Sequence, residues 1–400
     1  MVQLEELVLK AANQVDVNEV VRLAQKLVQI ESCYPGPGEA PVVEFLERYL
    51  QQHGFRTQVQ DVAPGRPNLI ADIGSGPGGI ILEGHTDVVT PGDLSAWEIP
   101  PYEGRIVGGK LYGRGSCDMK GGLAAAIVAA STIKKVLGEP KKTLRLCIPC
   151  DEEGLMTGIK AFVKAGYADG FAGAVICEPE ENEICLWQKG AMRVRLEFKG
   201  RMAHGAMPYA GANPIPSAAR FVAKLGELQA DLQKESEHRH LGQPWITPTV
   251  FQASAGEGQV NVIPDRVTLF LDIRTNPDQD HREIEQGLRE RLAASLEEGV
   301  AAGLEVFEDR PATETAAREP IVKATEKALS LLGMPLCYGG VPGATDGTYL
   351  WAWANLPIVT IGPGGRRMPH QVNEFVEIDE LVASARLYTA ICALMLVREE

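Results

Sequence analysis

Short apolar runs alternate with segments of helical periodicity along most of this chain. Apolar residues recur every three to four positions over residues 17–31, and residues 40–54 repeat that pattern up to Gly54, so both segments are predicted helices. The runs FRTQVQDV, NLIADIG and GIILEG follow, each bounded by turn residues, which is typical of strands. This alternation predicts an α/β fold.

The same patterns predict the helices and strands that follow. Residues 106–112 (IVGGKLY) predict a hairpin turned at Gly108 and Gly109. Residues 121–136 predict a helix of small residues that can pack closely on a sheet. Further strands are expected at 144–150, 174–177 and 357–361, and further helices at 320–332 and 378–397.

The pattern changes near Gly190 and later changes back. From Met192 the residues alternate between apolar and polar (MRVRLEFKG), as in a strand with one buried face. A strand–helix–strand–strand–helix module is expected here, with its later elements at 215–228, 249–254, 266–274 and 280–298. An inserted α+β domain at 190–309 would therefore interrupt an α/β domain formed by 1–189 and 310–400.

Composition narrows the class of protein. The chain has 400 residues, too many for one ordinary core, and its 45% hydrophobic and 23% charged residues are usual for a globular protein. The net charge of −14 argues against nucleic-acid and anionic-membrane partners. The N-terminus carries acids where a signal peptide needs bases, and the longest apolar run, 123–130, is too short to cross a bilayer. We therefore expect a cytoplasmic protein.

The cysteines do not indicate a disulfide framework. Eight cysteines are spread over the chain without compact spacing. Cys147 and Cys150 form a Cys-x-x-Cys pair inside a strand-like run, where their side chains would face opposite ways. Core packing in a reducing compartment is the favoured interpretation.

His85 and Asp87 follow the predicted strand GIILEG directly. In an open α/β sheet, ligands gather beyond the carboxyl ends of strands. Residues two apart in an extended chain point the same way, so this pair can supply a metal-binding imidazole and the group that orients it. Taken alone, His-x-Asp is more often a hydrogen-bonded core pair than a metal site.

Further candidate ligands follow other turns and strand ends. They are Asp118 after a glycine-flanked turn, Glu153 and Glu178 after predicted strands, and His370 after the loop GPGGRRMPH. Imidazoles and carboxylates suit zinc, cobalt or manganese more than calcium. Together with His85, these residues would supply three carboxylates and two neutral imidazoles. Two divalent ions bound by them would keep one net positive charge, which favours a bridging hydroxide as nucleophile.

Five ligands suffice for two ions only if one carboxylate bridges them, and Asp118 is the natural candidate. Glu152, beside Glu153, would then be a free carboxylate able to take a proton from water. Without the other residues, this Glu-Glu pair would be interpreted as a solvated acidic turn.

These motifs carry a family resemblance. HTDVV, GRIVGGKLYGRGSCDMKGG, DEEG, CEPE and PHQVNE occur in this order, and from about residue 17 to the C-terminus the chain resembles the di-zinc hydrolases that include acetylornithine deacetylase, succinyl-diaminopimelate desuccinylase, aminoacylase and glutamate carboxypeptidase. The resemblance implies one ion on His85, Asp118 and Glu178, and a second on Asp118, Glu153 and His370. It also implies a cis peptide bond between Asp118 and Met119.

The resemblance further assigns catalytic and substrate-binding roles. Asp87 would orient His85, and Glu152 would be general base and then general acid. His204, in GRMAHGAMP, would help bind the oxyanion in the partner's active site. The implied substrate contacts are Asn261, Arg274 (to an α-carboxylate) and Thr345 in GATDG. The alternatives are a surface-loop histidine for His204 and a strand-end salt bridge for Arg274.

The expected architecture is a di-metal catalytic domain, with a mixed sheet and helices on both faces, and a lid at 190–309 that also forms a homodimer. The expected function is hydrolysis of an N-acyl amino acid, of N-acetylornithine or N-succinyl-diaminopimelate type, by attack of a metal-bridging hydroxide. Zinc is the expected metal, with cobalt or manganese as alternatives. Alternative functions are a dipeptidase or carboxypeptidase of the same family, or a non-catalytic metal-binding scaffold.

Overall fold

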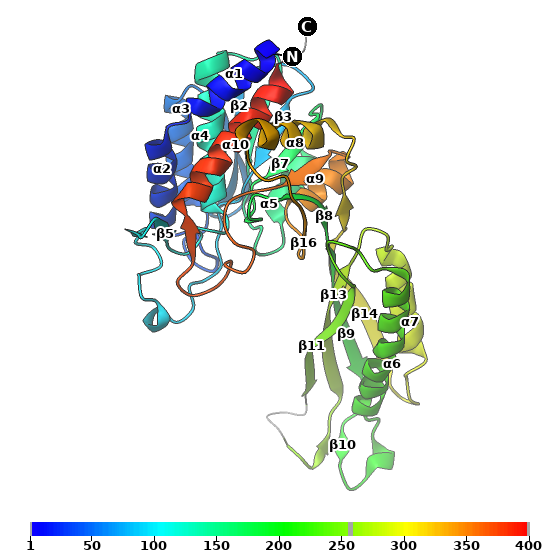
Figure 1. Cartoon of the computed structure of the whole chain (residues 1–400). Helices are drawn as coiled ribbons and strands as arrows, with labels where there is room; N and C mark the ends of the chain where they lie inside the picture. The colour runs from blue at the N-terminus through cyan, green and yellow to red at the C-terminus, as the bar shows by residue number, and fades with distance from the viewer. Residues whose placement is uncertain (1, 255–258, 398–400) are drawn as a thin grey trace. The chain divides into compact units, whose positions relative to one another are not determined.

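The computed structural model describes residues 2–254 and 259–397 and divides into two compact units (Figure 1). The first comprises the described residues within Met1–Leu186, Thr315–Val341 and Thr345–Glu400, and the second comprises those within Trp187–Glu314 and Pro342–Ala344. The second unit is thus an insertion in the chain of the first.

The first unit is built on a mixed sheet, as predicted. In the part of the chain that the structure describes, nine strands pair in the order β1-β2-β6-β3-β7-β17-β8-β15, with β16 beside β8. Their bounds are β1 Arg56–Ala63, β2 Arg66–Ile73, β3 Ile80–Glu83, β6 Leu144–Ile148, β7 Gly173–Ile176, β8 Ile184–Gln188, β15 Thr313–Glu314, β16 Tyr338–Val341 and β17 Ile358–Thr360. The central strands β6, β3, β7 and β17 run parallel, and antiparallel strands flank them.

Helices cover both faces of this sheet. On one face, α5 (Thr157–Lys164) and α9 (Gly347–Ala354) share a buried cluster with Ile70, Ile81 and Ile176 of the strands. On the other lie α4 and α10, with α2 and α8 packed against them. The bounds of the remaining helices of this unit are α1 Val2–Asn13, α2 Val17–Gln29, α3 Ala40–Gln52, α4 Lys120–Leu137, α8 Pro320–Leu332 and α10 Ile378–Leu396.

Sequence periodicity located most of these elements to within a few residues. The elements that were not expected include α1, α5, α9, β8, β15 and β16. Cys150 lies beyond the end of β6 rather than inside the strand, although Cys147 and Cys150 are both buried free thiols. Among the described residues, no helix combines the length and apolar character needed to cross a membrane.

The predicted hairpin is present and gains a third strand. β4 (Ile106–Val107) and β5 (Lys110–Tyr112) are joined at Gly108 and Gly109, whose φ angles are 58° and 80°, the left-handed values that this turn requires. β18 (Phe375–Glu377) pairs with β5. This pairing brings the chain after His370 beside the segment that leads to Asp118.

The second unit is a four-stranded antiparallel sheet with two helices. The strand order is β11-β13-β9-β14, and Met192, Val194 and Leu196 of β9 point into a core shared with both helices. The bounds are β9 Gly190–Lys199, β10 Ala203–His204, α6 Pro214–Glu235, β11 Trp245–Ser254, β12 Val262–Ile263, β13 Arg266–Thr275, α7 His281–Ala293 and β14 Ala301–Arg310.

The expected strand–helix–strand–strand–helix module was incomplete. α7 ends at Ala293 instead of 298, and β14 follows it as an edge strand. Exposed and less exposed positions alternate along β14, AAGLEVFEDR, but the exposed positions include Ala301 and Phe307 and the buried ones are Glu308 and Arg310. Polarity along the sequence therefore does not follow the strand period. The long run of helix-forming residues before it obscured the boundary.

The close packing of α4 generates a prediction. A Cβ atom added to Gly122 would lie 2.0 Å from the backbone oxygen of Cys177, so Gly122→Ala must displace α4 from the sheet. We expect this variant to lose about 1–3 kcal/mol of stability, the usual cost of overpacking, seen by calorimetry as a lower unfolding temperature.

The control is Gly226→Ala in α6, where the added Cβ meets nothing within 4 Å. There alanine should stabilise the helix by about 0.5–1 kcal/mol. If both variants melt like the unaltered protein, the close approach of α4 to the sheet is wrong.

Candidate metal centre

Three neighbouring parallel strands deliver candidate ligands to one edge of the sheet. β3 lies between β6 and β7, parallel to both. His85 follows β3, Glu152 and Glu153 follow β6, and Glu178 follows β7. Because the carboxyl ends of parallel strands adjoin, the side chains converge as the sequence indicated.

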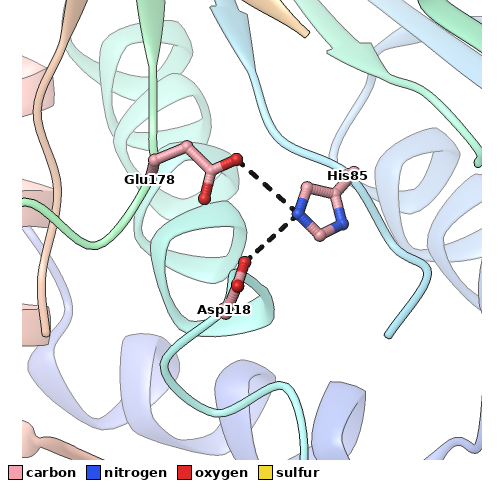
Figure 2. A group of neighbouring side chains, drawn as sticks. All are labelled: His85, Asp118 and Glu178. Atoms are coloured by element: carbon pink, nitrogen blue, oxygen red, sulfur yellow. Dashed lines mark ion pairs between the residues drawn. The ribbon is translucent and has the colours of Figure 1, made fainter. Parts of the chain in front are cut away.

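The first group consists of His85, Asp118 and Glu178 (Figure 2). His85 Nε2 lies 3.3 Å from Asp118 Oδ1 and 3.7 Å from Glu178 Oε1. This nitrogen is buried and makes no hydrogen bond to any described residue. The other ring nitrogen, Nδ1, is 3.0 Å from the backbone oxygen of Asp87 and 3.5 Å from its Oδ1, so Nδ1 carries a proton and Nε2 would present its lone pair to a bound ion.

The second group consists of Asp118, Glu153 and His370. His370 Nε2 lies 3.0 Å from Glu153 Oε1 and 3.4 Å from Asp118 Oδ2. Asp118 therefore directs a different oxygen to each group, the arrangement of a bridging carboxylate. The Asp118–Met119 peptide bond is cis, as the resemblance implied.

The donor set fits divalent ions. In each group, one ligand atom from every residue lies within 4.8 Å of the others, and all are imidazole nitrogens or carboxylate oxygens, the donors of zinc, cobalt and manganese sites. Among the described residues, the buried Nε2 of His85 has no hydrogen-bond partner, as expected of a nitrogen that binds an ion. Two ions sharing Asp118 would satisfy both groups.

Glu152 belongs to neither group. Its Oε2 lies 4.0 Å from His85 Nε2, and the side chain is only 11% exposed. Burial raises the pKa of Glu152 to about 8, with His85 opposing and Glu153 and Asp118 adding to the rise. Cations bound beside it would lower that pKa, so the carboxyl would exchange protons near neutral pH.

The pKa values of the ligands reflect their crowding. Hydrogen bonding to Asp118 and Glu153 raises the pKa of His370 to about 10, against the effect of burial. Burial acts to raise the pKa of Asp118, but the two histidines hold it well below its usual range. Burial also raises the pKa of Glu178, and the neighbouring Asp118 adds to this.

Glu374 and Arg114 hold the segment that carries Asp118. Glu374 is fully buried, and its carboxylate accepts hydrogen bonds from the backbone N–H groups of Gly115, Cys117 and Asp118 at 3.1, 2.9 and 3.0 Å. Arg114 pairs with Glu374 and donates to the backbone oxygen of His370 at 3.3 Å. Both residues lie within the sequence motifs, but the sequence alone indicated no role for either.

Two further buried carboxyls adjoin the site. Glu83 and Asp346 are each 1% exposed, and none of their oxygens has a hydrogen-bond partner among the described residues. Burial raises the pKa of Glu83 to about 8 and that of Asp346 well above its usual value. A raised pKa favours the neutral form of each carboxyl, which adds no charge to an already acidic site.

Asp87 contacts both His85 and the segment that carries Glu152 and Glu153. Besides its contacts with His85, its carboxylate accepts the backbone N–H groups of Glu152 and Glu153, each at 3.1 Å. It therefore positions the candidate base and a ligand as well as the imidazole.

The other predicted site residues are divided between the units. His204 and Asn261 lie together in the second unit, where β10 pairs with β12 and Gly205 N donates to Asn261 O. Arg274 lies near the end of β13 and pairs with Asp272. Thr345 is buried in the first unit, where its hydroxyl accepts from Gly347 N at 3.3 Å. Their roles toward a substrate stay predictions.

Comparisons with known proteins agree with this architecture. The family model described as peptidase family M20/M25/M40 matches residues 81–393. A succinyl-diaminopimelate desuccinylase of Thioalkalivibrio sulfidiphilus is 29% identical over 400 residues, covering 95% of this chain and 100% of the relative.

Two solved structures share the fold. An M20 family metallo-carboxypeptidase of Sulfolobus solfataricus superposes with a TM-score of 0.77 at 18% identity, covering 94% of this chain and 99% of its own. A dinuclear metal-binding peptidase of Bacillus subtilis gives 0.70 at 17% identity, covering 95% and 98%. Since the family model covers well over half of its length, the chain belongs to peptidase family M20/M25/M40 and is a metallohydrolase.

Proposed function

We propose that this metallohydrolase removes the acyl group from an N-acyl amino acid, of N-acetylornithine or N-succinyl-diaminopimelate type. The observation that carries the proposal is a free, buried carboxylate, Glu152, beside two ligand groups that share Asp118. A protein that only stores metal needs no such carboxylate. The name of the desuccinylase relative favours an acylated amino acid as substrate.

The chemistry follows from these positions. Two divalent ions at the site, zinc in this proposal with cobalt or manganese as alternatives, would polarise the scissile carbonyl and acidify water. Glu152 accepts the proton of the attacking water and passes it to the leaving amine, so that one residue serves as base and then as acid. Asp87 keeps His85 in the tautomer that exposes Nε2.

His204 is suited to donate a hydrogen bond. Its Nδ1 accepts the backbone N–H of Ala206 at 3.0 Å, so Nε2 carries the proton of the neutral ring. We assign this N–H to the developing oxyanion. In the same proposal, the second unit is a lid that dimerises in the cytoplasm and His204 acts on the partner's active site.

Arg274 is suited to bind the substrate carboxylate. Its Nε and one terminal nitrogen point to Asp272 at 2.7 and 3.3 Å, and a guanidinium has five N–H groups in total. Its planar fork matches a carboxylate. Asn261 and Thr345 complete the proposed substrate contacts.

A peptidase activity is the second candidate. The solved structures with this fold include peptidases and dipeptidases by name. The same metal centre and base would hydrolyse a peptide bond, so the choice depends on whether the substrate's amine is acylated or free.

A substrate panel tests the proposal directly. With zinc or cobalt added, the protein should hydrolyse N-acetyl or N-succinyl amino acids faster than dipeptides that have a free amine, as measured by release of primary amine. Faster cleavage of the dipeptides would establish the second candidate. No hydrolysis of any panel member, with metal bound, would contradict both.

Glu152→Gln removes the proposed base and keeps its shape. We expect turnover to fall by about 10²–10⁴-fold, the range for general acid–base catalysis, while metal content by elemental analysis is unchanged. Glu181→Gln removes the same charge from an exposed residue nearby and should leave turnover unaltered. Full activity of the metal-loaded Glu152→Gln protein would exclude the role.

His204→Ala tests the lid. Loss of one oxyanion donor should reduce turnover by about 10²–10³-fold, with a smaller change in KM, because the contact forms in the transition state.

Mixing inactive Glu152→Gln chains with inactive His204→Ala chains should restore activity. If chains exchange freely, about a quarter of all sites regain both groups across a two-fold interface. Background activity despite demonstrated exchange would show that His204 does not act across a dimer.

A further inference from the structure

A buried network of three residues lies behind the acidic loop that follows β6. Glu39 is fully buried, and Arg66 and Asp151 are 8% and 6% exposed. Arg66 Nε lies 3.1 and 3.0 Å from the two Glu39 oxygens, and its Nη1 donates to Asp151 Oδ1 at 2.6 Å. We call these three residues the Arg66 network.

The network holds the backbone of the acidic loop at its first residue. The N–H of Asp151 donates to Glu39 Oε1 at 3.0 Å. The second oxygen of Asp151 accepts the backbone N–H of Thr157 at 3.2 Å and its hydroxyl at 2.6 Å. Asp151 has a φ of 65°, a conformation that a non-glycine residue rarely adopts and that surrounding contacts must maintain.

Arg66 also reaches the carboxylate that holds the next two residues. Its Nη2 lies 3.9 Å from Asp87 Oδ2, and Asp87 accepts the N–H groups of Glu152 and Glu153. One guanidinium thus balances three buried carboxylates: Glu39, Asp151 and Asp87. Each of them bonds to the backbone of the acidic loop.

Three of the five N–H groups of Arg66 bond to buried carboxylates. Its Nε and Nη2 serve Glu39, and its Nη1 serves Asp151. The ring of Tyr34 covers the guanidinium, with its centre 4.3 Å from Cζ. The arginine therefore acts through the residues that it holds.

We infer that Arg66 is a positioning residue that sets the affinity of one of the two metal sites. The loop that it holds carries Glu153, a member of the Asp118–Glu153–His370 group alone. The other group takes His85, Asp118 and Glu178 from different segments. Without Arg66, three carboxylates would repel one another at low dielectric, and the loop with Glu153 and Glu152 would move.

This inference rests on the proposed two-ion site, and its main readout needs no substrate. Co²⁺ alone is titrated into chelator-treated full-length protein, and binding is followed by visible absorption. The binding step that is lost in His370→Ala is the step that belongs to the Asp118–Glu153–His370 group. Arg66→Met should weaken that step by about ten- to a hundredfold, the usual effect of losing an outer partner of a metal ligand. The other step should weaken less, because Arg66 reaches His85 only through Asp87, 3.9 Å away.

Two milder variants keep the test informative if Arg66→Met fails to fold. Arg66→Lys keeps a charge but not the planar fork, so it should restore part of the affinity. Glu39→Gln keeps the shape of its residue and should give a smaller loss at the same step. In the substrate assay, Arg66→Met should lower kcat more than KM, because the base moves with the loop.

Arg145→Met is the matched control. Arg145 is a partly buried arginine of β6, paired with both oxygens of Asp72 at 2.7 and 2.6 Å and bonded to the backbone of Tyr167. It supports the sheet but not the acidic loop. Equal weakening of both Co²⁺ steps, an unchanged second step, or the same pattern in Arg145→Met would overturn the inference. A single step in the unaltered protein would refute the two-ion proposal and this inference with it.

Discussion

Mutual repulsion among carboxylates is the constraint on which the rest of this structure depends. Asp87, Asp118, Glu152, Glu153 and Glu178 converge on a largely buried volume around two imidazoles. At an effective dielectric of 20, two unit charges 4 Å apart interact by about 4 kcal/mol. Such a cluster would spread apart unless each carboxylate were hydrogen-bonded, protonated or beside a cation. The raised pKa values of Glu83 and Asp346, which favour their neutral forms, and the buried Arg66 and Arg114 answer that requirement.

Two buried Arg–Glu pairs counter this repulsion in the same way. Glu39 with Arg66, and Glu374 with Arg114, are buried pairs whose carboxylates accept backbone N–H groups from ligand-bearing segments. A buried ion pair contributes little net stability, because desolvation offsets the attraction. What these pairs contribute is geometry: a guanidinium and a carboxylate can each make several directed bonds. The pairs therefore position ligands more than they stabilise the fold.

The sequence predicted the parts of the site that follow from strand order. Polar residues after three apolar runs indicated His85, Glu153 and Glu178, and the small residues of α4 indicated close packing on a sheet. It did not reveal Arg66, because its partners lie 27 and 85 positions away and no local pattern relates them. The edge strand β14 was missed for the opposite reason: its local pattern is weak, and only its pairing with β9 defines it.

The predicted site residues of the two units differ in how firmly they are held. Around the metal centre, buried bonds hold the segments that carry Asp118, Glu152 and Glu153, and His85 has no exposed surface, whereas the side chain of His370 is exposed. In the second unit, His204 and Asn261 are exposed; the side chain of His204 accepts a bond from Ala206 N, and the backbone oxygen of Asn261 accepts one from Gly205 N. Preorganisation is needed where like charges must be held in place before any substrate arrives. Groups that meet only a bound substrate gain from staying accessible, since their binding energy is then realised in the transition state. The Arg–Glu pairs that hold the ligand segments, Arg66 with Glu39 and Arg114 with Glu374, both lie in the first unit, as this division of roles requires.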